Sequence, residues 1–110
     1  MSSDKLSVLV VDDDDDDREI FCMALSETDP SIKCLTANDA MEALKMLKDP
    51  TFLPDYIFLD LNMPKMDGIE ATRLIKSRYP DVTVVGLSVN ANAHNETAML
   101  DAGAALLLTK

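Results

Sequence analysis

The stretch DYIFLDL, residues 55–61, decides the fold of this chain. Its central residues 56–59 form a continuous apolar run between two aspartates, too short for a helix and without the alternation of a half-exposed strand. Such runs are typical of strands that are buried on both faces of a parallel sheet. Asp60 stands at the carboxyl end of this predicted strand, so an acidic side chain is expected at the edge of the sheet.

Segments on either side of residues 55–61 alternate between strand and helix patterns. Four further runs rich in β-branched and aliphatic residues are predicted as strands: 5–11, 31–37, 82–89 and 104–109. Four segments carry apolar residues at helical spacing: 18–28, 40–48, 69–79 and 96–102. The first of these segments carries its stripe on Ile20, Phe21, Ala24 and Leu25. Strand and helix alternation of this kind predicts an α/β fold, a doubly wound five-stranded parallel sheet in one domain spanning residues 1–110.

A helix pattern follows every predicted strand except the last. A fifth helix is expected to cover the sheet beside strand 104–109, and this last helix is absent from the chain. We therefore expect a domain that is truncated at its C-terminus or that belongs to a longer protein.

Composition restricts the class of protein. The chain has 110 residues, 47% of them apolar, and a net charge of −10 from twenty acidic and ten basic side chains. Such acidity opposes direct binding to nucleic acid or to anionic membranes. The N-terminus lacks the layout of a signal peptide and no apolar run is long enough to span a bilayer, so a cytoplasmic location is expected. Cys22 and Cys34 have no metal-ligand spacing and are predicted to be reduced, buried residues.

Polar residues follow four of the predicted strands at their carboxyl ends. In open parallel sheets ligands bind beyond these ends. Two carboxylates about 4 Å apart repel by roughly 4 kcal/mol at an effective dielectric near 20, so several acids together call for a cation. Mg²⁺ fits because it prefers oxygen ligands, and a carboxylate beside it can act as a nucleophile toward a phosphoryl group. The residues concerned are Asp12, Asp13, Asp60, Ser88 and Lys110.

The run of aspartates at 12–17 permits a second interpretation, a calcium loop. The EF-hand pattern needs Gly at loop position six. In the frames that start at residues 12, 13 and 14, this position is Asp17, Arg18 or Glu19, and the pattern fails. For residues 14–17 we expect instead a cap and an acidic first turn at the N-terminus of a helix. His94 is predicted to be exposed, and Asp67 to cap the third helix.

Five motifs in register resemble the receiver domains of bacterial response regulators: VLVVDD at 8–13, FLDLNMP at 58–64, MDG at 66–68, GLS at 86–88 and LLLTK at 106–110. The resemblance covers essentially the whole chain. It implies a flavodoxin-like strand order, 2-1-3-4-5. It also implies two-component signalling, in which a histidine kinase or histidine phosphotransfer protein donates the phosphoryl group and an output domain or effector protein reads the change.

The resemblance assigns roles residue by residue. Asp60 would be the phosphoacceptor, with Ser88 as the switch hydroxyl and Lys110 as the counter-charge of the phosphoryl group. Asp13 and Asp60 would bind Mg²⁺ directly, Asp12 through water, and Asn62 through its backbone carbonyl. Such a chain would be no enzyme, except in catalysing its own phosphoryl transfer and autodephosphorylation.

Leu107 departs from the family pattern, because the position three before the lysine is often Tyr or Phe. Its presence gives weight to an alternative, a receiver-like docking module that works without phosphorylation. A metal-dependent phosphatase with an aspartyl nucleophile is a further alternative. It would need an acid two residues after Asp60, where Asn62 stands.

Overall fold

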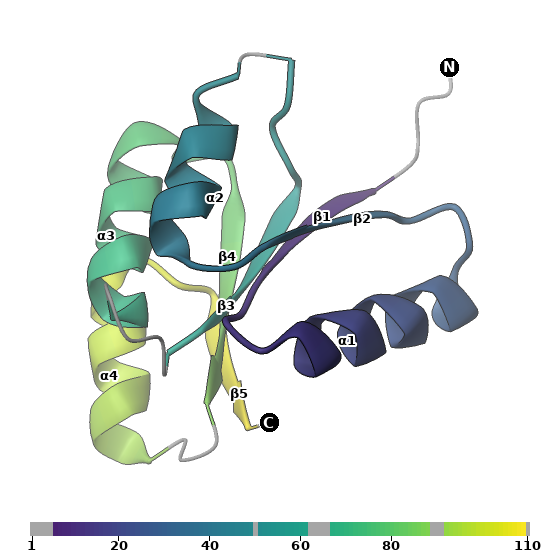
Figure 1. The fold of residues 1–110 in the computed structure, drawn as a ribbon. Coiled ribbons are helices and arrows are strands. Elements are labelled where there is room, and N and C mark those ends of the chain that lie inside the picture. Colours follow the sequence, from purple (N-terminus) through teal and green to yellow (C-terminus); the bar gives the residue numbers. More distant parts are fainter. Residues whose placement is uncertain (1–5, 50, 62–66, 89–91, 110) are drawn as a thin grey trace.

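The computed structural model describes residues 6–49, 51–61, 67–88 and 92–109, which form a parallel sheet between two layers of helix (Figure 1). The strand order is β2-β1-β3-β4-β5, and every pair is parallel. The predicted doubly wound sheet and its 2-1-3-4-5 order are thereby confirmed. The elements are β1 Ser7–Val11, α1 Asp15–Thr28, β2 Lys33–Ala37, α2 Ala40–Leu47, β3 Tyr56–Asp60, α3 Gly68–Arg78, β4 Thr83–Ser88, α4 Ala93–Ala102 and β5 Leu106–Thr109.

The main hydrophobic core lies between the sheet and helices α2, α3 and α4, which cover one face (Figure 1). Strand residues alternate between the two faces of a sheet, so every second residue of β1 and β3 points into this layer. Those residues are Leu9, Val11, Ile57 and Leu59. The helices contribute small and aliphatic side chains that allow close packing: Ala43, Leu47, Ala71, Ile75 and Met99. This packing fixes the carboxyl ends of the central strands in space.

Helix α1 covers the other face of the sheet. Asp14 caps it by accepting hydrogen bonds from the backbone N–H groups of Asp16 (2.9 Å) and Asp17 (3.1 Å), as predicted for this acidic segment. Its apolar stripe is only partly covered, because Ile20 is 64% exposed and no residue of α1, which is described in full, is buried. Among the described residues no second helix lies beside α1 on this face, so the outer part of the stripe has nothing to pack against.

Helix α4 begins three residues earlier than its apolar spacing predicts. Asn92 caps it by accepting a hydrogen bond from the Asn95 N–H (2.9 Å), so the polar residues assigned to a loop form the first turn. His94 lies exposed in that turn, as predicted for its exposure. Gly103 ends the helix at the expected position with φ 114°, a left-handed conformation that favours glycine.

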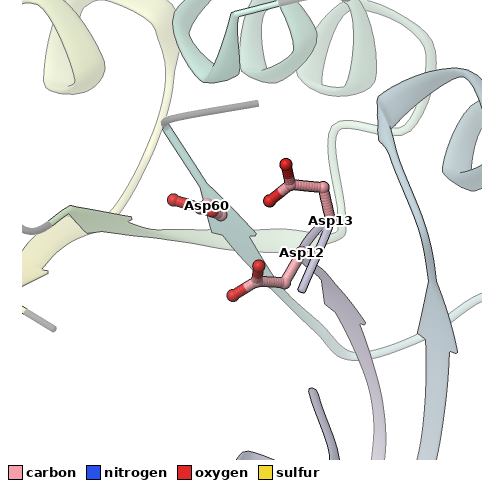
Figure 2. A group of neighbouring side chains, drawn as sticks. All are labelled: Asp12, Asp13 and Asp60. Atoms are coloured by element: carbon pink, nitrogen blue, oxygen red, sulfur yellow. The ribbon is translucent and has the colours of Figure 1, made fainter. Parts of the chain in front are cut away.

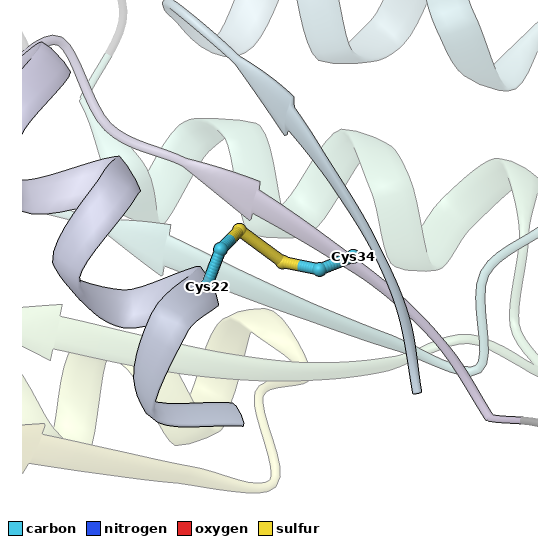
Figure 3. Close-up of a disulfide and its surroundings, with 2 residues drawn as sticks. All are labelled: Cys22 and Cys34. Atoms are coloured by element: carbon cyan, nitrogen blue, oxygen red, sulfur yellow. A yellow bond between two sulfur atoms is a disulfide. The ribbon is translucent and has the colours of Figure 1, made fainter. Parts of the chain in front are cut away.

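The two cysteines differ from their predicted state. Cys22 on α1 and Cys34 on β2 form a disulfide with a Cα–Cα distance of 6.0 Å, and both residues are half-buried (Figure 3). The prediction of reduced, buried thiols rested on their spacing along the chain. Spacing does not show that the inward face of α1 brings one cysteine against the edge strand that carries the other.

Among the described segments, no helix is long and apolar enough to cross a membrane.

Candidate functional site

The register of the sheet brings three of the predicted site residues, Asp12, Asp60 and Ser88, to one edge. Val11, the last residue of β1, pairs with Leu59 of β3, so Asp12 and Asp60 follow at the same height. Asp60 in turn pairs with Leu87, and Ser88 follows at the end of β4. The site therefore straddles the point between β1 and β3 where the strand order reverses, the usual ligand position in open α/β sheets.

Three carboxylates meet at this point (Figure 2). Asp12, Asp13 and Asp60 each offer a carboxylate oxygen, and these oxygens all lie within 4.8 Å of one another. Asp12 and Asp60 are each 2% exposed, whereas Asp13 is exposed. The cluster thus has two buried walls and one side that is open to solvent.

The chain around Asp12 holds its carboxylate in place. One carboxylate oxygen accepts a hydrogen bond from the backbone N–H of Asp14 (3.0 Å), and the Asp12 N–H donates to the carbonyl of Ala37 (3.2 Å). The guanidinium of Arg18 donates to the Asp12 carbonyl (2.6 Å) and also pairs with Asp15. Arg18 was not among the site residues that the sequence pattern predicted. Its position one turn after Asp14, on the face of α1 that begins at the acidic cluster, was the available signal.

Asp60 is positioned by β3 and by the start of α3. A Cβ added at Gly68 would lie 2.9 Å from the Cα of Leu61 and 3.2 Å from the carbonyl oxygen of Asp60. Only glycine allows α3 to begin this close to the end of β3. Asp67 caps α3 through the Glu70 N–H (2.7 Å), as predicted.

The chemistry of this donor set fits a hard divalent cation. Like charges at this separation repel, and two of the three carboxylates have little access to solvent that would screen them. A small cation with oxygen ligands relieves the repulsion and takes water or substrate oxygens in its remaining positions. The acidic pocket can therefore hold Mg²⁺.

Ser88 is 1% exposed at the end of β4, one strand away from Asp60 on the side opposite β1. The remaining predicted site residues, Asn62 and Lys110, lie outside the described residues, as does Pro64 of the motif after Asp60. Leu107, the residue that departs from the family pattern, is 8% exposed and belongs to the core under α4.

Fold and acidic edge together define a flavodoxin-like α/β domain with a carboxylate pocket at its topological switch point. Residues 8–110 match the family model described as the response regulator receiver domain, and the chain belongs to this family of two-component signalling domains.

Proteins similar to this chain contain the matching segment within longer sequences. The sensor histidine kinase RcsC of Salmonella typhimurium is 34% identical over 109 residues, 99% of this chain and 11% of that protein. The transcriptional regulatory protein DegU of Brevibacillus brevis is 32% identical over 111 residues, 100% of this chain and 46% of that protein. The chain thus spans less than half the length of these relatives. Among solved structures, the phosphorylated cyanobacterial phytochrome response regulator RcpA superposes with a TM-score of 0.87 at 30% identity, over 96% of this chain and 81% of that one.

Proposed function

We propose that this chain is a phosphorylation-controlled switch in which Asp60 accepts a phosphoryl group. The observation that carries the proposal is the carboxylate cluster at the switch point, whose oxygens lie within 4.8 Å of one another. In the strand order, Asp60 stands between the carboxylates that follow β1 and the hydroxyl of Ser88 that ends β4. A phosphoryl group on Asp60 would therefore have a cation-binding group on one side and a hydrogen-bond donor on the other.

In the transfer, a carboxylate oxygen of Asp60 attacks the phosphorus of a phosphohistidine donor. The O–P bond forms, the P–N bond breaks, and the imidazole leaves with the electron pair. Ser88 donates its hydroxyl proton in a hydrogen bond to a phosphoryl oxygen, and the Lys110 ammonium pairs with the same group. The side chain of Asp12 is already oriented by the Asp14 N–H, so it holds its place while the charge at Asp60 changes.

Mg²⁺ is the cofactor in this proposal. Asp12, Asp13 and Asp60 would hold it, together with the backbone carbonyl of Asn62. When bound, the ion neutralises the negative charge that gathers between the carboxylates and the phosphoryl oxygens.

The partners follow from the same proposal. A histidine kinase or histidine phosphotransfer protein donates the phosphoryl group in the cytoplasm, and an output domain or effector protein reads the altered surface. The chain acts on no substrate besides its own Asp60. Its net charge of −10 gives no support to direct nucleic-acid binding.

We further propose that a helix after Lys110 covers the open part of the α1 face in the longer protein. A groove of about 340 Å³ lies there, lined mainly by apolar side chains of α1 and of the strands beside it, Ile20, Phe21, Leu87 and Leu108 among them. Leu106 and Leu108 of β5 are 43% and 44% exposed, although they belong to a sheet strand. Apolar strand residues of this kind are normally covered by a helix in a doubly wound fold.

One observation favours a second function, a receiver-like module that docks partners without phosphorylation. Leu107 packs inward, where an added Cβ on Gly86 would approach its Cδ1 to 2.9 Å. Because this residue is a leucine, position 107 has no ring that can swing between two positions. The two functions differ in whether Asp60 accepts a phosphoryl group, which an experiment can test.

The decisive experiment is intact-mass spectrometry after incubation with acetyl phosphate, with and without Mg²⁺. The wild type should gain one labile phosphoryl group only when Mg²⁺ is present, and Asp60→Asn should gain none. Asp101→Asn, which removes the same charge from an exposed position on α4, should behave as the wild type. A folded wild type that stays unmodified, also in a version extended past Lys110, would leave the docking module as the better function.

A further inference from the structure

Helix α1 is held on the sheet by a small contact surface. None of its fourteen described residues is buried, whereas the eight-residue α2 buries four. Phe21 and Leu25 are half-buried, and the ring of Phe21 lies 4.8 Å from that of Phe58. Ile20 and Met23 are 64% and 56% exposed. With so little apolar area removed from water, local opening of α1 costs less than opening of the helices on the other face.

The disulfide between Cys22 and Cys34 is the covalent link of α1 to the sheet (Figure 3). The Cα–Cα distance of 6.0 Å lies in the range that a disulfide spans without displacing the backbone. Cys34 belongs to β2, an edge strand of the sheet, and both cysteines are half-buried. A small thiol or disulfide can therefore approach the pair from the edge.

The link lies on the face of α1 that leads to the acidic site. Asp14, Arg18 and Cys22 follow one another at intervals of four residues and so share one face of the helix. Asp14 caps the helix, and Arg18 donates a hydrogen bond to the carbonyl of Asp12 (2.6 Å). A bond at Cys22 thus restrains the same face that orients Asp12.

We infer that Cys22 and Cys34 are a reversible redox site, which takes low-molecular-weight disulfides of the oxidised-glutathione class as its co-reactant and anchors α1 when oxidised. One cysteine thiolate attacks the small disulfide, forms a mixed disulfide and releases one small thiolate. The second cysteine thiolate attacks the protein sulfur of that mixed disulfide and releases the other. In total, two protein thiols lose two electrons and two protons, and one small disulfide becomes two small thiols.

The oxidised protein should melt about 10 °C higher than the reduced one, because the crosslink restricts the unfolded chain and reduction releases that restriction. The local effect should be confined to the α1 side. Amide hydrogen exchange in residues 15–28 should be at least about tenfold slower in the oxidised state, while exchange in α3 should change little.

The test uses the full 110-residue chain equilibrated with mixtures of reduced and oxidised glutathione. Free thiols are then trapped with N-ethylmaleimide and counted by intact mass. Hydrogen exchange is measured in the most reducing and in the most oxidising mixture. The expected result is a reversible transition between two alkylated thiols and none. Cys22→Ser and Cys34→Ser should each show one alkylated thiol in reducing mixtures and one glutathione adduct in oxidising mixtures. Their α1 exchange should match that of the reduced wild type in every mixture. Since reduction of the wild type needs no substitution, the test stands even where a variant fails to fold.

Three results would overturn the inference. Alkylation of both thiols in every mixture would show that the cysteines do not pair. A bond that persists in every glutathione mixture and yields only to dithiothreitol in denaturant would show a static crosslink. Equal α1 exchange in the two states would show that the bond does not anchor the helix. None of these readouts depends on Asp60, so failure of phosphoryl acceptance leaves the inference standing, and the reverse also holds.

Discussion

At the scale of single residues, Asp13 differs from the other two members of the cluster because it is exposed while they are buried. Its charge is therefore the one that can be removed without leaving a buried cavity or an unpaired buried group. Asp13 also makes the cluster a triad, and without a cation it adds repulsion to a site that already holds two carboxylates.

Asp13→Asn should therefore have opposite effects with and without Mg²⁺. We expect Mg²⁺ affinity to fall at least about tenfold, equivalent to ~1.4 kcal/mol, because a charged ligand is lost. In EDTA the free energy of unfolding should rise by about 0.5 kcal/mol, because a like charge at an exposed position is removed. Urea unfolding in EDTA and in Mg²⁺ measures both. Asp101→Asn is the matched control, and a loss of stability in EDTA would contradict the role given to Asp13.

A second residue-scale prediction concerns Asp29 after α1. The Ser31 hydroxyl (2.8 Å) and then the Ser31 backbone N–H (3.0 Å) donate hydrogen bonds to its carboxylate and hold the pKa of Asp29 below its usual 3.8. A depressed pKa contributes stability that is present above the unfolded pKa and is lost as pH falls through the folded pKa. Ser31→Ala should raise the pKa of Asp29 only partly toward 3.8, because the N–H remains. Carbon-detected NMR titration checks this, with Asp49 beside Thr51 as an internal reference that should not move.

At the scale of elements, the contact between β3 and α3 depends on Gly68. The groups that an added Cβ would meet at 2.9 and 3.2 Å are backbone atoms of Leu61 and Asp60, which cannot turn away as a flexible side chain can. Any substitution here must displace the start of α3 or the end of β3, and the latter carries the proposed phosphoacceptor.

Gly68→Ala should destabilise the fold by about 1–3 kcal/mol, the usual cost of forcing extra volume into a packed position. The clash outweighs the gain in helix propensity from replacing glycine by alanine, which is about 1 kcal/mol. Thermal unfolding measures the cost, and the rate of phosphorylation by acetyl phosphate reports the displacement at Asp60. Ser77→Ala, at an exposed position of the same helix, is the control and should change the free energy of unfolding by less than about 0.5 kcal/mol. A variant as stable as the wild type would show that α3 can shift freely.

The elements show where sequence patterns suffice and where they fail. The five strands were predictable because continuous apolar runs such as residues 56–59 have few other places in a fold. The start of α4 was missed because Asn92 caps from within a polar segment that carries no apolar period. In α1 the apolar period correctly predicted the helix, but it did not indicate that no residue of the helix is buried. Periodicity reports the direction in which a side chain points and says nothing about whether another element lies there.

At the scale of the whole molecule, the edge that collects Asp12, Asp60 and Ser88 was predictable from a topological rule. Parallel strands joined by crossover helices end at one edge, so residues that follow strands meet there whatever their separation in sequence. The disulfide obeys no such rule. Cys22 and Cys34 meet because α1 turns one particular face toward an edge strand, which depends on helix rotation and not on strand order.

The last prediction concerns the open part of the α1 face. The chain should bind the dye ANS in the groove beside β5, because Ile20 and Leu108 are 64% and 44% exposed around a hollow of about 340 Å³. Ile20→Gln combined with Leu108→Thr should abolish most of this fluorescence at a cost in stability below about 1 kcal/mol, since Ile20 lies largely in water and Leu108 is nearly half exposed. Leu100→Gln, which removes a 46% exposed leucine from α4 on the other face, should leave the signal unchanged. In a version extended past Lys110 the wild-type signal should itself be low, because the proposed helix would fill the groove. Equal fluorescence from the extended and the 110-residue proteins would contradict that covering and leave the groove free for a partner chain.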